Sequence, residues 1–197
     1  MKPDDPLLVR FAAGDSGNWD IRAISCLSGP GFPIASRLAI FEGHAAHITR
    51  SCVWQLLGIT SHQRYTTALE ARKLATVQPP LARPTATHAA LIPIRKSAGW
   101  WRLAQDERRA IYEERSRHTS IGLEYLPRIA RRLHHCRDLG EPFDFLTWFE
   151  FAPEHEPAFD ELLARLRATE EWRYVDREVE VRLSRREVSG SLATRSD

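Results

Sequence analysis

The chain has 197 residues, of which 43% are hydrophobic and 27% are charged, so it is long enough to bury one sizeable core or two small cores sharing a sheet. Its 28 basic residues nearly balance its 26 acidic residues, and the formal net charge of +2 excludes a broad electrostatic surface for nucleic acid or an anionic membrane. The longest apolar runs, such as AALIPI, fall far short of the roughly 20 residues that cross a bilayer.

Cysteine usage and the first residues predict a cytoplasmic location. Three scattered cysteines, Cys26, Cys52 and Cys136, form neither an even disulfide framework nor a CxxC pair. The start, MKPDDPLLVR, lacks the basic end and apolar stretch of a secretory signal. We therefore expect a protein of a reducing compartment.

The first part of the chain predicts short strands, one helix and a boundary. The strands are expected at 7–13, 21–28, 36–43 and 51–60, with GPGFP as a break. A helix is expected at 66–78, before the proline-rich segment QPPLARP at 78–84. This segment divides the chain into an N-terminal half, 1–84, and a C-terminal half, 85–185, followed by a frayed tail, 186–197.

The second half predicts the element order β-α-β-β-α-β of a ferredoxin-like unit. Its elements are expected at 86–94, 103–118, 128–137, 143–151, 155–168 and 172–183. Gly140, Glu141 and Pro142 predict the turn between the two central strands. The first half is interpreted as a degenerate second copy, so the whole chain can form one sheet that curls on itself.

His118 is a candidate metal ligand at the end of the helix expected at 103–118. Ala104, Ile111 and His118 are seven residues apart, which places them along nearly one helix face. A neutral imidazole on that face can bind a metal. The alternative is a histidine that stabilises the helix C-terminus through the helix dipole.

Arg131 is a candidate anion-binding residue on the strand that follows. Strand alternation places Arg131 on the same side of its strand as Ile129, Leu133 and His135. The matching side of the next strand carries Phe143, Phe145, Thr147, Phe149 and Phe151, so the wall around Arg131 is mainly apolar. Burying an unpaired guanidinium costs several kcal/mol, which indicates an anion or a functional reason. The alternatives are a carboxylate partner such as Glu150 or a solvated strand edge.

The run His134, His135 and Cys136 does not predict a zinc site. Adjacent strand residues point to opposite faces and do not readily chelate one ion.

Four segments resemble the chlorite dismutase family, whose members are haem b proteins built from two ferredoxin-like halves. The segments are IRKSAGWWRLAQDERR, RHTSIGLEYLPRIARRLHHCRDLG, FDFLTWFEFAPE and EEWRYVDREVEVRL. The resemblance runs from about Tyr65 to Leu183. It implies an α+β fold in which two ferredoxin-like halves form a dimeric α+β barrel, and the short chain resembles the cytoplasmic, homodimeric members.

The resemblance also implies roles for individual residues. His118 matches the proximal ligand of the haem iron, thirteen residues before the distal arginine, Arg131. Glu171 matches the acceptor for the ligand's other ring nitrogen, although the neighbouring Glu170 is an alternative. Lys96 resembles the lysine that meets a haem propionate, and its alternative is a solvated lysine. The remaining matches are Trp101 on the haem edge, Leu133, Thr147 and Phe149 in the distal lining, and Tyr65, whose register is blurred by insertions. Trp100 is interpreted as a core aromatic.

The implied activity is the conversion of chlorite to chloride and dioxygen through a ferryl intermediate and transient hypochlorite. Glu171 would make His118 a more electron-rich ligand, and Arg131 would hold hypochlorite by charge-assisted hydrogen bonds. The absence of CxxCH argues against covalently attached haem. The expected partners are a small anion such as chlorite and a second copy of the chain, with neither nucleic acid nor membrane.

Three other functions are considered. A coproheme decarboxylase lacks the distal arginine, so Arg131 weighs against that reaction. A haem-binding sensor or carrier would have the same pocket without turnover. Peroxidase activity would need a distal base, and no carboxylate is expected beside Arg131, so that activity should be weak.

Overall fold

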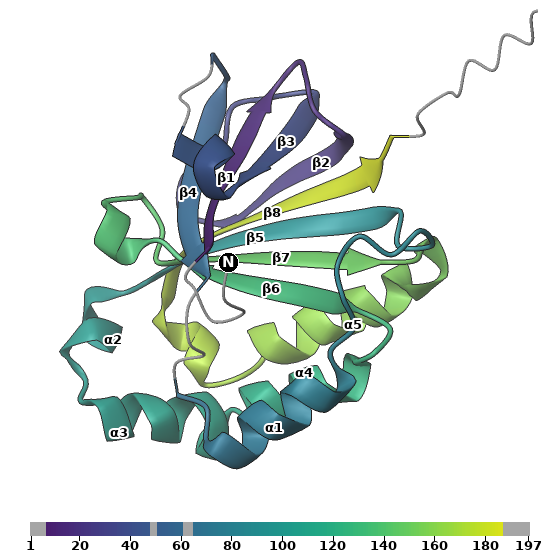
Figure 1. The fold of residues 1–197 in the computed structure, drawn as a ribbon. Helices are drawn as coiled ribbons and strands as arrows, with labels where there is room; N and C mark the ends of the chain where they lie inside the picture. The colour runs from purple at the N-terminus through teal and green to yellow at the C-terminus, as the bar shows by residue number, and fades with distance from the viewer. Residues whose placement is uncertain (1–6, 48–50, 61–64, 187–197) are drawn as a thin grey trace, which may run out of the picture.

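Eight antiparallel strands close into one barrel in the computed structural model, which describes residues 7–47, 51–60 and 65–186. The strand order around the barrel is β1-β3-β2-β8-β5-β7-β6-β4 (Figure 1). The strands are β1 (Leu7–Gly14), β2 (Trp19–Ser28), β3 (Arg37–Glu42), β4 (Trp54–Thr60), β5 (His88–Lys96), β6 (Ala130–His135), β7 (Phe145–Phe151) and β8 (Val175–Arg185). The barrel closes where β2 pairs with β8 and where Ile59 of β4 pairs with His135 of β6.

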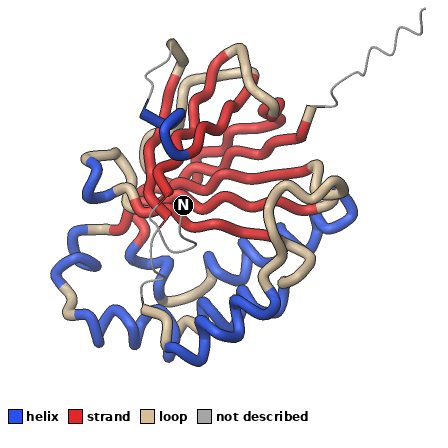
Figure 2. Tube along the Cα trace, in the orientation of Figure 1, coloured by secondary structure: helices blue, strands red, loops and turns tan. Residues whose placement is uncertain are grey.

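The α-helices gather along one side of the barrel, as Figures 1 and 2 show. They are α1 (Ala68–Val77), α2 (Ala98–Arg102), α3 (Gln105–Arg109), α4 (His118–Tyr125) and α5 (Glu156–Arg167). A π-helical turn, η2 (Ala110–Arg115), follows α3 directly, and short 3-10 turns are η1 (Gly43–His47), η3 (Arg137–Leu139), η4 (Pro153–His155) and η5 (Glu171–Tyr174). In the described ranges no helix combines the length and apolarity needed to cross a bilayer.

The sheet is buried on both faces where the helices cover it, which creates two cores. In β5, Ala89 and Leu91 belong to the core inside the barrel, whereas Ala90, Ile92 and Ile94 belong to the core between the sheet and the helices. This explains why β5 is apolar along most of its length rather than alternating with polar residues. The second core is the one that positions the candidate site.

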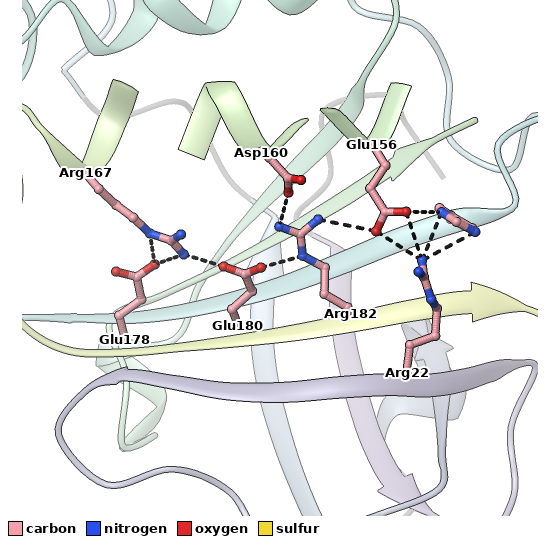
Figure 3. Close-up of polar contacts among 8 residues, drawn as sticks. Arg22, Glu156, Asp160, Arg167, Glu178, Glu180 and Arg182 are labelled. Carbon is pink, nitrogen blue, oxygen red and sulfur yellow. Dashed lines mark hydrogen bonds and ion pairs between the residues drawn. The ribbon is translucent and has the colours of Figure 1, made fainter. Parts of the chain in front are cut away.

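Helix α5 is fastened to the sheet by apolar packing and by an ion-pair network. Its buried face carries Phe159, Leu162, Leu163 and Leu166. Figure 3 shows Arg182 of β8 reaching Asp160 at 2.7 Å and also contacting Glu180. Arg167 at the other end of the helix binds Glu178 at 2.6 Å and Glu180 at 2.5 Å. A connected network of this kind stabilises more than isolated surface pairs do.

Most predicted elements are confirmed with shifted ends, but the continuous helix expected at 103–118 is wrong. The structure breaks this segment into α3, η2 and α4, and His118 begins α4 instead of ending a helix. Arg117 adopts the left-handed conformation, with φ of 53°, and a right-handed helix does not pass through such a residue. Ala104 is an exposed residue before α3, so the common face predicted for Ala104, Ile111 and His118 does not exist.

Candidate functional site

One large pocket lies between the sheet and the helices, with an empty volume of about 1050 Å³ that includes the part open to solvent. Strands β5, β6 and β7 form one wall, which includes Ile92, Ile94, Arg131, Leu133, Thr147 and Phe149. Tyr112 and residues of α4 and α5 form much of the opposite wall, which includes His118, Leu162, Leu163 and Leu166. The lining is therefore mainly apolar, with a few polar groups at defined places.

His118, Glu171 and Lys96 form a chain of charged contacts at one end of the pocket. The Nδ1 atom of His118 lies 2.6 Å from Oε2 of Glu171, and Nζ of Lys96 lies 2.7 Å from Oε1 of the same carboxylate. Glu171 is only 4% exposed, and burial alone would raise the pKa of its carboxyl group. Attraction to His118 and to the Lys96 ammonium outweighs this and lowers the pKa of Glu171 to about 2. An ionised Glu171 can accept a hydrogen bond from the Nδ1–H group of His118, which leaves Nε2 available as a ligand.

Local structure explains why His118 can make this contact. The left-handed Arg117 ends η2 and starts a new helix at His118. The Glu113 carboxylate caps that helix, accepting hydrogen bonds from the amide of Thr119 at 2.6 Å and of Ser120 at 3.2 Å. Ser116 accepts a hydrogen bond from the Glu171 amide at 2.9 Å, so the segment before the break is tied to the residue that contacts His118.

Lys96 is 5% exposed, so it is not a solvated lysine, and its Nζ pairs with the Glu171 carboxylate. Its Nζ also lies 4.8 Å from the ring centre of Trp100 and 5.5 Å from that of Trp172. The role of Lys96 toward a haem propionate stays a prediction. Glu170, the alternative to Glu171, instead binds Arg115 at 3.3 Å.

Trp101 lies one layer outside the pocket lining. Its ring stacks against Phe145, which does line the pocket, with 6.1 Å between ring centres. Its Nε1 donates to Asp144 at 3.1 Å, and the Arg137 guanidinium lies 3.8 Å from the ring centre. Trp100 is 1% exposed, as expected for a core aromatic, although part of it also lines the pocket.

Arg131 reaches the pocket from the sheet. Among the described residues, no carboxylate lies within ion-pair distance of its guanidinium. Glu150, the partner named in the alternative interpretation of Arg131, instead accepts hydrogen bonds from the amide of Ala82 at 2.6 Å and from the Trp148 indole at 3.0 Å. The backbone carbonyl of Arg131 accepts a hydrogen bond from Gln78 at 3.0 Å, which ties the strand to the end of α1. The backbone at Arg131 is therefore tied to α1, while its guanidinium has no carboxylate partner in the part of the chain that the structure describes.

The strand alternation predicted around Arg131 is largely confirmed. Leu133, Thr147 and Phe149 line the pocket beside it, as do Ile129 and His135. Phe143 is an exception, because it precedes β7 and packs in the core inside the barrel. The regular alternation of a strand does not extend into the turn before it.

Tyr65 also lines the pocket, and its hydroxyl accepts a hydrogen bond from Arg108 at 3.2 Å. The chain adopts a positive φ of 63° at this residue. Residues 61–64 lie outside the described ranges, so the structure describes this part of the chain only from Tyr65 onward.

Several pocket residues were missed by sequence reasoning, and Tyr112 is the most important. Its ring stacks on the His118 imidazole, with 4.5 Å between ring centres and 22° between planes. The ring is partly buried in the pocket wall, and desolvation of the hydroxyl raises its pKa to about 12. In a regular helix a residue six positions away lies on another face, so only the π-helical turn and the break bring Tyr112 to His118.

His134 and His135 point to opposite faces of β6, as the sequence predicts for adjacent residues of a strand. His134 packs edge-on against Phe11 inside the barrel, whereas His135 lines the pocket outside it. The described part of the chain holds no group of three or more histidine, cysteine or acidic residues arranged to hold a metal ion.

Comparisons with a family model, a curated protein and solved structures all indicate the same family. A family model described as chlorite dismutase matches residues 39–187. A chlorite dismutase of Ideonella dechloratans is 34% identical over 86 residues, which are 44% of this chain and 28% of that protein. The match thus spans less than a third of that relative.

Solved structures extend the likeness to nearly the whole chain. A dimeric chlorite dismutase from Nitrobacter winogradskyi is 54% identical, with a TM-score of 0.84 over 90% of this chain and 99% of its own. A chlorite dismutase from Candidatus Nitrospira defluvii, solved in complex with imidazole, is 20% identical with a TM-score of 0.62 over 90% of this chain and 91% of its own. At that identity the second likeness concerns the fold alone.

Proposed function

The chain belongs to the chlorite dismutase family, and from this premise we propose that it binds haem b in the pocket lined by His118 and Arg131 and decomposes chlorite to chloride and dioxygen. The observation that carries the proposal is one mainly apolar pocket. It has an imidazole backed by an ionised carboxylate on the helix side and, on the sheet side, a guanidinium without a carboxylate partner among the described residues.

The residues present fit a haem group. The walls of the pocket are mainly apolar with a few polar groups at defined places, as is usual for cofactor sites. His118 offers the nitrogen ligand that haem iron accepts, and Glu171 holds the other ring nitrogen. Leu162, Leu163 and Leu166 of α5 would contact the macrocycle from the same side of the pocket. When bound, haem iron supplies the redox chemistry that breaks the Cl–O bonds and forms dioxygen.

The sheet side suits a reaction of this stoichiometry. Conversion of chlorite to chloride and dioxygen needs no net proton, so the substrate side requires a fixed positive charge rather than a general base. Arg131 keeps its charge at any physiological pH and can bind an oxyanion through two parallel N–H donors. It would hold chlorite and the hypochlorite anion formed from it, while Leu133 and Phe149 exclude water.

An oxygen electrode tests the proposal. The purified protein is loaded with haem and mixed with chlorite, and we expect one dioxygen for each chlorite consumed. H118A should lose most of its haem and its oxygen evolution. Haem binding without oxygen evolution by the parent protein would favour a carrier or sensor, and conversion of added coproheme to haem b would favour a decarboxylase. Either result would overturn the proposed activity.

We also propose that the barrel consists of two related ferredoxin-like halves, 1–84 and 85–185. The strand orders β4-β1-β3-β2 and β8-β5-β7-β6 support this, because both halves follow the fourth-first-third-second order of that unit. Among the residues described between β3 and β4, the N-terminal half has only the short turn η1, which is consistent with a degenerate copy.

A homodimer is the assembly that we propose, supported by the dimeric Nitrobacter winogradskyi protein at 54% identity. Light scattering should give about twice the chain mass of 22.6 kDa. The cytoplasmic location remains a prediction, supported by cysteines that are free thiols in the part of the chain described.

A further inference from the structure

We propose that Tyr112 is a positioning residue that fixes the plane of the His118 imidazole, an inference that rests on the proposed haem function. The stacked contact between the two rings, 4.5 Å between centres and 22° between planes, is the observation from which it starts. Tyr112 lines the same pocket, so it would lie beside the histidine that would hold the haem iron.

Glu171 by itself restrains only part of the ligand's orientation. Its single contact, 2.6 Å from Oε2 to Nδ1, restrains one edge of the ring and leaves the ring able to tilt about that contact. An aromatic ring packed parallel to the imidazole opposes this tilt, because any rotation separates the two faces or makes them clash. Glu171 therefore restrains the ring nitrogen, and Tyr112 restrains the ring plane.

Tyr112 can act in this way because the chain holds it firmly. Thr119, the residue after His118, donates a hydrogen bond to the Tyr112 hydroxyl at 3.4 Å. Glu113, the residue after Tyr112, accepts the Thr119 amide hydrogen at 2.6 Å. Two separate hydrogen bonds thus join Thr119, the neighbour of one stacked ring, to Tyr112 and to its neighbour Glu113. The Tyr65 ring packs on Tyr112 at 5.7 Å between centres and limits its movement.

The test compares ferric haem-loaded variants by electron paramagnetic resonance, because the signal of ferric haem responds to the orientation of its axial imidazole. Tyr112→Phe keeps the ring and removes the hydroxyl, whereas Tyr112→Leu removes the ring. We expect Y112F to match the parent. Y112L should show broadened or multiple ferric signals and lose haem to an acceptor protein about tenfold faster.

Tyr174→Leu is the matched control, since Tyr174 packs edge-on against Trp100 at 5.5 Å and is absent from the pocket lining. It should give the parent signal and haem-loss rate. Parent-like behaviour of Y112L, or equal changes in Y112F and Y112L, would overturn the inference.

A measurement on the unaltered chain keeps the inference testable if Y112L does not fold. In the haem-free protein, the stacked phenol ring should shift the His118 ring-proton resonance upfield, with the resonance assigned by its loss in His118→Gln. An unshifted resonance would contradict the stacking. Failure of the parent protein to bind haem would refute the proposed function instead, so the two failures are distinguishable.

Discussion

At the residue scale, the pocket contains two cations in opposite situations. The Lys96 charge is buried and neutralised by Glu171 at 2.7 Å, whereas Arg131 has no carboxylate partner among the described residues. A lysine in the first situation is a structural component, because its removal leaves a buried carboxylate uncompensated. An arginine in the second situation is available to an anion.

We expect Arg131→Ala to retain haem and to evolve oxygen roughly a hundredfold more slowly, because the anion loses its electrostatic donor. More hypochlorite should escape, which a chlorination-sensitive dye would trap, and the enzyme should inactivate sooner. The control is Arg132→Ala on the same strand, since Arg132 binds Glu42 and His134 rather than lining the pocket. Equal oxygen yield and lifetime in R131A and the parent would remove Arg131 from the mechanism.

Replacing Lys96 by Met should destabilise the haem-free protein by about 3 to 5 kcal/mol, the usual cost of breaking a buried ion pair. Urea unfolding measures this. Lys73→Met on the exposed face of α1 should stay within about 0.5 kcal/mol of the parent. If K96M weakens haem binding while the haem-free stability is unchanged, Lys96 acts on the cofactor and not through Glu171.

At the element scale, breaks in a helical segment and a close contact between two strands determine where the site residues lie. The break at Arg117 turns His118 toward Glu171, and the π-helical turn brings Tyr112 beside it. On the barrel side, β4 passes close to β6 at Gly58. A Cβ added there would lie 2.7 Å from the His134 Cβ and 3.3 Å from Leu146 Cδ1. Both neighbours belong to strands of the pocket wall.

Gly58→Ala should therefore destabilise the protein by about 1 to 3 kcal/mol through overpacking against β6. Gly14→Ala is the control, because its added Cβ would meet no atom closer than 3.8 Å. Thermal and urea unfolding of the two variants should differ in that direction. Equal stability of G58A and G14A would mean that β4 moves away from β6 at little cost.

At the scale of the whole molecule, the sheet separates a dry barrel interior from the pocket. His134 lies inside, fully buried, with its Nδ1 atom donating to the Leu146 carbonyl at 3.0 Å and its Nε2 atom accepting from Arg132 at 3.2 Å. Burial, with further contributions from the charges of Arg132 and His135, lowers the pKa of His134 to about 3. The folded barrel thus holds a neutral histidine where the unfolded chain holds one that titrates normally.

This difference predicts acid sensitivity. Between about pH 6.5 and pH 3 the unfolded chain binds a proton at His134 that the folded chain does not, so stability falls as pH falls through this window. The contribution lost is roughly 3 to 5 kcal/mol. His134→Asn should flatten the slope of unfolding free energy against pH in that window, whereas His44→Asn at an exposed site should leave it unchanged. An unchanged slope in H134N would assign the acid sensitivity to other groups.

Local patterns in the sequence determined much of this protein. Alternation along β6 and β7 selected Arg131, Leu133, Thr147 and Phe149 as one wall, because a strand's side chains alternate whatever surrounds it. The element order predicted for the second half of the chain matches the strands β5, β6, β7 and β8 and the helix α5 of the structure.

The tertiary structure alone decided the contacts that depend on distant or interrupted segments. Lys96 and Glu171 are 75 positions apart, and no periodicity relates them. Tyr112 contacts His118 because a left-handed residue and a π-helical turn change the direction in which the following side chains point. The regular repeat of an α-helix does not predict this change. Strand faces follow from local geometry, whereas the ionisation of Glu171 and the orientation of the His118 ring depend on which groups the fold brings together.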